Sequence, residues 1–164
     1  MNDDIILAAY HADVDLLKKC IMEKHDVNAK DDSGYTPLHR VAFLGAVGNK
    51  RLEMAHLLID AGADVNSVLP NEGPSVLSTA CQAGNYGIVK ILVTNGADIN
   101  FNGDGSTPLI EAIQCGSLKI ISYLLERGAD YNIPNAFGQY PIDVAEDYER
   151  QDIVELLTKF ANKH

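Results

Sequence analysis

The chain has 164 residues, of which 46% are hydrophobic and 22% are charged, a composition typical of a globular protein rather than a disordered one. A formal net charge of -10 and a pI of about 4.7 argue against nucleic acid or an anionic membrane surface as the main partner, and favour a neutral or basic protein. The start "MNDDIILAAY" is acidic where a signal peptide would be basic, and no apolar run approaches about 18 residues, so we expect a cytoplasmic protein without a membrane span.

Two short motifs recur along the chain at nearly equal intervals. Copies of Gly-Ala-Asp-x-Asn end 34 and 32 residues apart, at Asn66, Asn100 and Asn132. Copies of Gly-x-Thr-Pro-Leu begin at Gly34 and Gly105, with degraded versions at Gly73 and Gly138. A period of this length predicts a repeat protein built from stacked units.

The repeats divide the chain into five units, at residues 1–32, 33–71, 72–104, 105–137 and 138–164. The first unit lacks the Thr-Pro-Leu segment, and the second carries about five additional residues, Ala46 to Lys50, which we expect to form a loop between its two helices. In the third unit Val76 stands in place of the proline, and the fifth stops after its second helix. No linker remains, so we expect a single domain over 1–164.

Each unit has the signals of two helices followed by a turn. Thr36 or Thr107 can cap the first helix, with a proline at the first helical position, and this helix is expected to end near Gly45, Gly84 or Gly116. The second helix has apolar residues at helical spacing, as at Leu118, Ile121, Leu124 and Leu125. Gly62, Gly96 and Gly128 supply the left-handed residue that ends it, before a polar hairpin-like turn.

These motifs resemble the ankyrin repeat family over essentially the whole chain, above all Thr-Pro-Leu-His at 36–39 and Gly-Ala-Asp-Val-Asn at 62–66. The resemblance implies an all-α repeat fold, a solenoid of stacked helix-turn-helix units with β-hairpin-like loops. Its first and last units would act as caps, and a capped solenoid is expected to be a monomer.

Thr36 and His39 raise the question of a nucleophile and its base, because a hydroxyl beside an imidazole can be activated. The resemblance implies instead that His39 is structural and ties neighbouring loops together. The equivalent residues of later units, Ser78, Ile110 and Asp143, agree with that, since the units do without an imidazole there. Because other enzyme signatures are also absent, we predict a non-catalytic protein without a cofactor.

Asp98 to Gly105 imitates the first half of a calcium loop, with Asp98, Asn100 and Asn102 at the first, third and fifth positions. The twelfth position, which needs a bidentate glutamate, is Leu109. The cysteines, Cys20, Cys81 and Cys115, have no metal-ligand spacing. We therefore predict reduced thiols and no metal site.

In the ankyrin architecture, the turns and the exposed ends of the first helices line a concave face that binds other proteins. Carried over position by position, this face comprises Tyr10, His11, Asp32, Ser33, Tyr35, Phe43, Leu44, Asn71, Glu72, Gln82, Asp104, Ser106, Gln114, Phe137, Gln139, Asp147 and Tyr148. The aromatic residues of this set, in an acidic surround, are suited to anchoring a protein partner. Alternatively, some of them pack against a neighbouring unit, or the inserted loop covers Phe43 and Leu44.

The sequence thus predicts a protein–protein interaction module for a neutral or basic partner. One alternative is an inhibitor or immunity protein that neutralises a toxin or enzyme by direct binding; inhibitors of cyclin-dependent kinases share the repeat, but nothing more specific. Another alternative is a substrate of asparaginyl hydroxylation at Asn66, Asn100 or Asn132.

Overall fold

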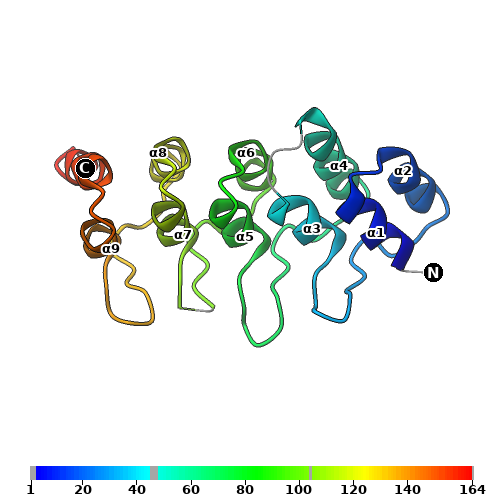
Figure 1. Ribbon diagram of the computed structural model, residues 1–164, viewed down its shortest axis with the longest axis horizontal. Coiled ribbons are helices and arrows are strands. Elements are labelled where there is room, and N and C mark those ends of the chain that lie inside the picture. Colours follow the sequence, from blue (N-terminus) through cyan, green and yellow to red (C-terminus); the bar gives the residue numbers. More distant parts are fainter. Residues whose placement is uncertain (1–2, 45–47, 104, 164) are drawn as a thin grey trace.

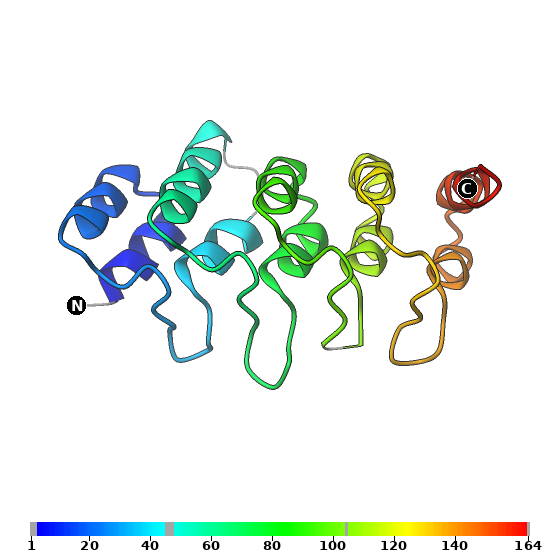
Figure 2. The same ribbon diagram turned by 180° about the vertical axis from the view of Figure 1, so that it is seen from behind.

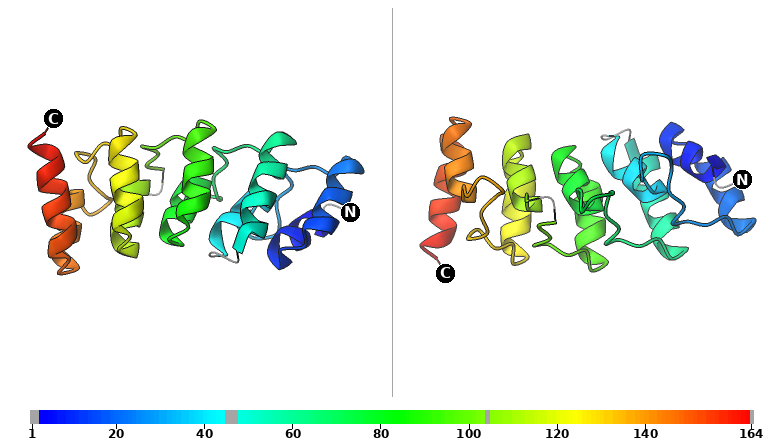
Figure 3. Two further views of the ribbon diagram at one scale, coloured as in Figure 1. Left: turned by 90° about the horizontal axis from the view of Figure 1, so that it is seen from above. Right: turned by 90° about the horizontal axis from the view of Figure 1, so that it is seen from below.

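The computed structural model describes residues 3–44, 48–103 and 105–163 and places ten helices in them, arranged as five pairs in a single row (Figures 1 and 3). The helices are α1 (Asp3–His11), α2 (Val14–Met22), α3 (Pro37–Phe43), α4 (Gly48–Asp60), α5 (Val76–Gln82), α6 (Tyr86–Thr94), α7 (Pro108–Cys115), α8 (Leu118–Glu126), α9 (Pro141–Asp147) and α10 (Gln151–Ala161). The odd-numbered helices form one layer and the even-numbered helices the other, and the turns project beyond the odd-numbered layer (Figure 2). The expected all-α solenoid is confirmed.

The first helices of the second, third and fourth units begin where the sequence predicts, because a hydroxyl caps each of them. Thr36 Oγ1 accepts a hydrogen bond from the His39 N–H (3.3 Å), and Thr107 Oγ1 accepts one from Ile110 (3.3 Å). Ser75 does the same for Ser78 (3.1 Å), so the third unit is capped although it lacks the proline. Each cap satisfies one of the N–H groups that a helix start leaves without a partner.

The turns that follow the second helices also agree with the prediction. Gly62, Gly96 and Gly128 have φ angles of 93°, 86° and 92°, in the left-handed region. In the longest turn Val68 and Ser75 form an antiparallel bridge, the one β-pairing within the described parts of the chain. The turns are therefore hairpin-like without containing a strand.

The additional residues of the second unit do not all form a loop, and that part of the prediction is wrong. Residues 48–50 are helical, and together with Arg51 they lengthen α4 to 13 residues, whereas α6 and α8 have 9 each. Ala46 and Val47 lie outside the described residues, as does Gly45, the expected end of the preceding helix.

Arg51 lies inside the longer helix and contacts the first unit. In units one, three and four the equivalent residues, Asp13, Asn85 and Ser117, cap the second helix with their own side chains. In the fifth unit Arg150 makes no such cap and donates instead to the Gly116 carbonyl at the end of α7 (3.2 Å). Arg51 resembles Arg150: its buried guanidinium donates to the carbonyls of Ala9 (3.2 Å) and Tyr10 (3.3 Å) at the end of α1. A cation at a helix C-terminus is favourable, so Arg51 joins the first two units.

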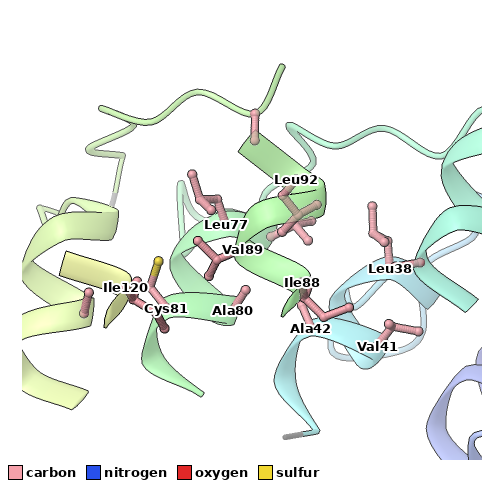
Figure 4. Close-up of a cluster of buried hydrophobic side chains, with 14 of the residues drawn as sticks. Leu38, Val41, Ala42, Leu77, Ala80, Cys81, Ile88, Val89, Leu92 and Ile120 are labelled. Atoms are coloured by element: carbon pink, nitrogen blue, oxygen red, sulfur yellow. The ribbon is translucent and has the colours of Figure 1, made fainter. Parts of the chain in front are cut away.

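The core runs without a break from one unit to the next. In the middle of the row, Leu77, Ala80 and Cys81 of α5 and Ile88, Val89 and Leu92 of α6 are at most 1% exposed. They lie between Leu38, Val41 and Ala42 of α3 and Ile120 of α8 (Figure 4). The small residues among them let neighbouring helices approach closely, and each unit buries its apolar side chains against the next.

A ladder of asparagines joins the turns on the side of the second helices. Asn66 Nδ2 donates to the Gly96 carbonyl (3.3 Å), and Asn66 Oδ1 accepts from the Asp98 N–H (2.8 Å). Asn28 binds the second unit and Asn100 the fourth in the same way. Asn132 occupies the equivalent position, but no Gly-Ala-Asp segment follows it in the chain.

We expect Asn66→Ala to lower the free energy of unfolding by about 1 to 2 kcal/mol, because it removes two hydrogen bonds and leaves two backbone groups to water. Asn132→Ala is the matched control and should change stability by less than about 0.5 kcal/mol. Urea denaturation followed by circular dichroism measures both. Equal losses in the two variants would contradict a stabilising ladder.

Candidate protein-binding surface

The predicted binding residues of the first helices form two rows along the solenoid. Tyr10, Phe43, Gln82, Gln114 and Asp147 occupy equivalent positions at the ends of α1, α3, α5, α7 and α9, and all five are exposed. The next residue along forms the second row: His11, Leu44, Ala83, Cys115 and Tyr148. These side chains therefore follow one another along the row of first helices, beside the projecting turns (Figure 1).

An aromatic cluster occupies this surface at the first two units. The rings of Tyr35 and Phe43 meet edge to face, with centroids 6.2 Å apart. The Arg40 guanidinium carbon lies 4.1 Å from the Tyr35 ring centre and 5.9 Å from that of Tyr10. Tyr10 is 47% exposed and Phe43 45%, so the described part of the chain leaves both accessible. We call Tyr10, Tyr35, Arg40 and Phe43 the aromatic cluster.

Asp31 holds the cluster in place from the first turn. Its Oδ1 accepts the N–H groups of Ser33 (2.9 Å) and Tyr35 (3.0 Å), and its Oδ2 accepts from Arg40 Nε (3.0 Å) and Nη2. Burial by itself would raise the pKa of Asp31, but the hydrogen bonds from Arg40, Tyr35 and Ser33 outweigh it and lower the pKa. The charged carboxylate therefore fixes both the turn and the guanidinium.

A pocket of about 350 Å³ opens beside the cluster, between α1 and the first turn. Its lining residues are Ile6, Leu7, Tyr10, His11, Asp31 and Arg40. Apolar side chains from α1 meet a paired carboxylate and guanidinium there. This size is at the lower end of the range of small ligand sites.

The other end of the surface is different in character. Phe137 at the tip of the last turn is 87% exposed, and Tyr148 is 53% exposed. Gln139 donates to the Asp147 carboxylate and accepts from Asn135 Nδ2 (3.0 Å), so both ends of its amide are bound to neighbouring side chains. The exposed glutamines of α5 and α7 separate this end from the aromatic cluster.

The longest turn carries Asn71 and Glu72 at its tip, with φ angles of 59° and 55°. Two successive left-handed residues are typical of a tight hairpin turn, where glycine usually occupies the second position. A residue other than glycine is uncommon in this conformation. Asp32 and Ser33 are exposed in the first turn, and Ser106 is half-buried in the third. Asp104 lies outside the described residues.

Thr36 and His39 are close together but inaccessible. Thr36 Oγ1 lies 2.9 Å from His39 Nδ1, and His39 is fully buried. Burial is the main reason why the pKa of His39 is lowered to about 4. The positive charges of Lys30 and Arg40 also lower this pKa, whereas the backbone of Pro74 and the Asp31 carboxylate act in the opposite direction. Ser75 and Ser78 form the same pair in the next unit, with hydroxyls 3.1 Å apart. A neutral imidazole without access to solvent supports the structural interpretation.

The side chains that imitate a calcium loop are engaged in the turn. Asp98 Oδ1 accepts from the Asn100 N–H (3.0 Å), and Asn100 Oδ1 accepts from Asp130 (2.8 Å). Across the described ranges, no three His, Cys, Asp or Glu side chains are grouped so that they could hold a metal ion. Nor does any helix in those ranges have the length and apolar character needed to cross a membrane.

Sequence reasoning did not identify Leu7, Asp31 and Arg40 as parts of the surface. Leu7 could have been found, because it lies three residues before Tyr10 and so on the same face of the helix. Arg40 has the same signal, because it lies three residues before Phe43, but its pairing with Asp31 does not follow from that spacing. Its position depends on its pairing with Asp31, nine residues earlier.

Comparison with known proteins gives a consistent result. A family model described as "Ankyrin repeats (3 copies)" matches residues 5–102, 43–135 and 102–164. Human "Ankyrin repeat and KH domain-containing protein 1" is 32% identical over 109 residues, which is 65% of this chain and 4% of that protein. Human "Ankyrin repeat and SOCS box protein 3" is 32% identical over 96 residues (57% and 18%), and "Protein VAPYRIN-LIKE" of Medicago truncatula is 46% identical over 46 residues (28% and 10%). The chain thus spans less than a fifth of the length of these relatives.

Proposed function

The chain belongs to the ankyrin repeat family, whose repeats generally mediate protein–protein interactions, and we propose that it is a non-catalytic module that binds a neutral or basic protein as a monomer. The observation that carries the proposal is the aromatic cluster of Tyr10, Tyr35, Arg40 and Phe43 on the predicted binding surface. Two half-exposed aromatic rings around a fixed arginine are the side chains that dominate protein interfaces.

The charge of the chain supports the choice of partner. With a net charge of -10, the protein attracts a basic partner over a distance and repels an acidic one. Such steering speeds association and is weakened by salt, whereas the buried aromatic contacts determine how slowly the complex dissociates. A basic partner should therefore associate more slowly at high salt, but it should still bind at the same surface.

Direct inhibition is the second form that this function can take. A solenoid that covers a basic enzyme or toxin through its binding surface would block access to that partner's active site. The activity of the partner in the complex distinguishes the two forms. An inhibitor abolishes this activity at a one-to-one ratio, whereas an adaptor leaves it intact.

We expect Tyr10→Ala combined with Phe43→Ala to reduce partner capture at least about tenfold, since each buried aromatic anchor contributes about 1 kcal/mol or more. The tagged protein would be captured from its source cells, and the recovered proteins quantified by mass spectrometry. Met22→Ala, combined with Leu118→Ala, is the matched control, because these side chains are 78% and 39% exposed but lie on α2 and α8 in the other layer.

Circular dichroism checks that both double variants keep the helical signal of the native protein. Loss of capture only in the Tyr10 and Phe43 variant would support the proposal. Equal capture by the native protein and this variant would contradict it.

A further inference from the structure

We propose that the pocket between α1 and the first turn receives one bulky apolar side chain of the partner, such as leucine, with a basic residue next to it. This inference rests on the proposed function and specifies the chemistry of the segment that binds. The exposure of Leu7, the pairing of Arg40 and the charges around the pocket support it.

Leu7 is the apolar residue that the pocket leaves accessible. The equivalent position in the later units holds Arg40, Thr79, Glu111 and Val144. Thr79, Glu111 and Val144 are only 3%, 8% and 2% exposed, whereas Leu7 is 49% exposed. The described chain covers this position in the last three units and leaves it open on α1. A side chain inserted beside Leu7 would remove its apolar surface from water, which is favourable.

Arg40 does not make the pocket a site for an anion. Its guanidinium is already bound through Nε and Nη2 to the Asp31 carboxylate, and the Tyr35 ring covers it at 4.1 Å. A carboxylate or phosphate entering the pocket would have to compete with Asp31 for the same donors. An uncharged side chain meets Ile6, Leu7 and the Tyr10 ring without that competition.

The charges near the pocket favour a basic neighbour for the inserted side chain. Asp4 lies one helical turn before Leu7 on the same face of α1, and Asp32 follows Asp31 in the turn; both are exposed. Lys30, which precedes Asp31 in the turn, is exposed as well. Asp31 and Arg40 neutralise each other, so Asp4 and Asp32 outnumber Lys30 among the exposed charges that adjoin the lining residues along the chain. A lysine or arginine next to the apolar residue is therefore attracted, and a glutamate is repelled.

The test is a titration of the full chain with capped dipeptides, followed by the backbone amide signals in NMR spectra. N-acetyl-leucyl-lysine amide should shift the signals of Leu7, Tyr10 and Arg40 in a saturable way. N-acetyl-leucyl-glutamate amide should bind at least about threefold more weakly because of the exposed charges of Asp4 and Asp32. N-acetyl-seryl-lysine amide should produce no saturable shift. Equal responses to the leucyl and seryl peptides, or shifts confined to other surfaces, would overturn the proposal.

Leu7→Gln separates this proposal from the broader function. The variant should lose the response to the leucyl peptide and capture less partner, while Leu118→Gln, the matched change at an exposed leucine of α8, should retain both. Since Leu7 is half-exposed, the variant should fold. If it captures the partner as well as the native protein does, while the Tyr10 and Phe43 variant fails, the pocket proposal is wrong and the proposed function stands.

Discussion

Leu77→Ala is expected to lower the free energy of unfolding by about 3 to 5 kcal/mol, because it leaves a cavity in the middle of the row. Leu77 follows the cap of α5 by two residues and is 1% exposed, in the core shared by three units. A loss of this size is a large part of the total stability of a typical domain, which is about 5 to 15 kcal/mol. Urea denaturation monitored by circular dichroism measures the difference.

Ile142→Ala is the matched control for this prediction. Ile142 holds the same position in the fifth unit, two residues after Tyr140, but it is 36% exposed, because within the described residues no following unit packs on it. Its truncation should cost about 1 kcal/mol or less, since less apolar surface is lost from the core. If the two variants lost equal stability, the account of a core shared between neighbouring units would be contradicted.

Acidification from pH 7 to pH 4 is expected to cost about 3 kcal/mol of stability through His39 alone, because each unit of pKa difference corresponds to about 1.4 kcal/mol. The pKa of this fully buried histidine is lowered from 6.5 to about 4 in the folded protein. Above pH 6.5 the imidazole is neutral in both states and has no effect. As the pH falls from 6.5 to about 4, the unfolded chain takes up a proton that the folded protein does not. Stability therefore declines over this range and levels off below it.

His39→Ser isolates this contribution, because a serine stands at the same position in the third unit, as Ser78, and pairs there with Ser75. The variant will be less stable at pH 7, since it leaves a cavity in place of the ring. The quantity to compare is the change in free energy of unfolding between pH 7 and pH 4, which should be smaller in the variant by about 3 kcal/mol. The same pH dependence in both proteins would show that His39 is not held neutral by burial.

Much of the fold could be predicted because its signals are local. Thr36 caps a helix through an N–H three residues away, and Gly62 takes a left-handed conformation that most other residues avoid. The length of α4 could not be predicted in this way, since Gly48 and Asn49 are residues typical of turns and yet residues 48–50 are helical. Arg51 was missed for a related reason. Its acceptors belong to another unit, 42 and 41 residues earlier in the chain.

The proposed binding surface could be predicted only as a set of positions. The repeat fixes that Tyr10 and Phe43 lie at the exposed ends of their helices, and both are accessible. The repeat does not fix which side chains meet. The contacts of Arg40 with the two tyrosines depend on side-chain conformation and on one carboxylate in a turn. Patterns along the sequence carry no information about such contacts.

Hydrogen exchange of the complex with its captured partner tests the central claim most directly. The partner should slow exchange in the segments that carry the aromatic cluster, residues 5–12 and 33–44, because their amides become covered in the complex. The exposed faces of α2, α6 and α8 should exchange as they do in the free protein. Protection confined to those second helices, with residues 5–12 and 33–44 unchanged, would contradict binding through the predicted surface.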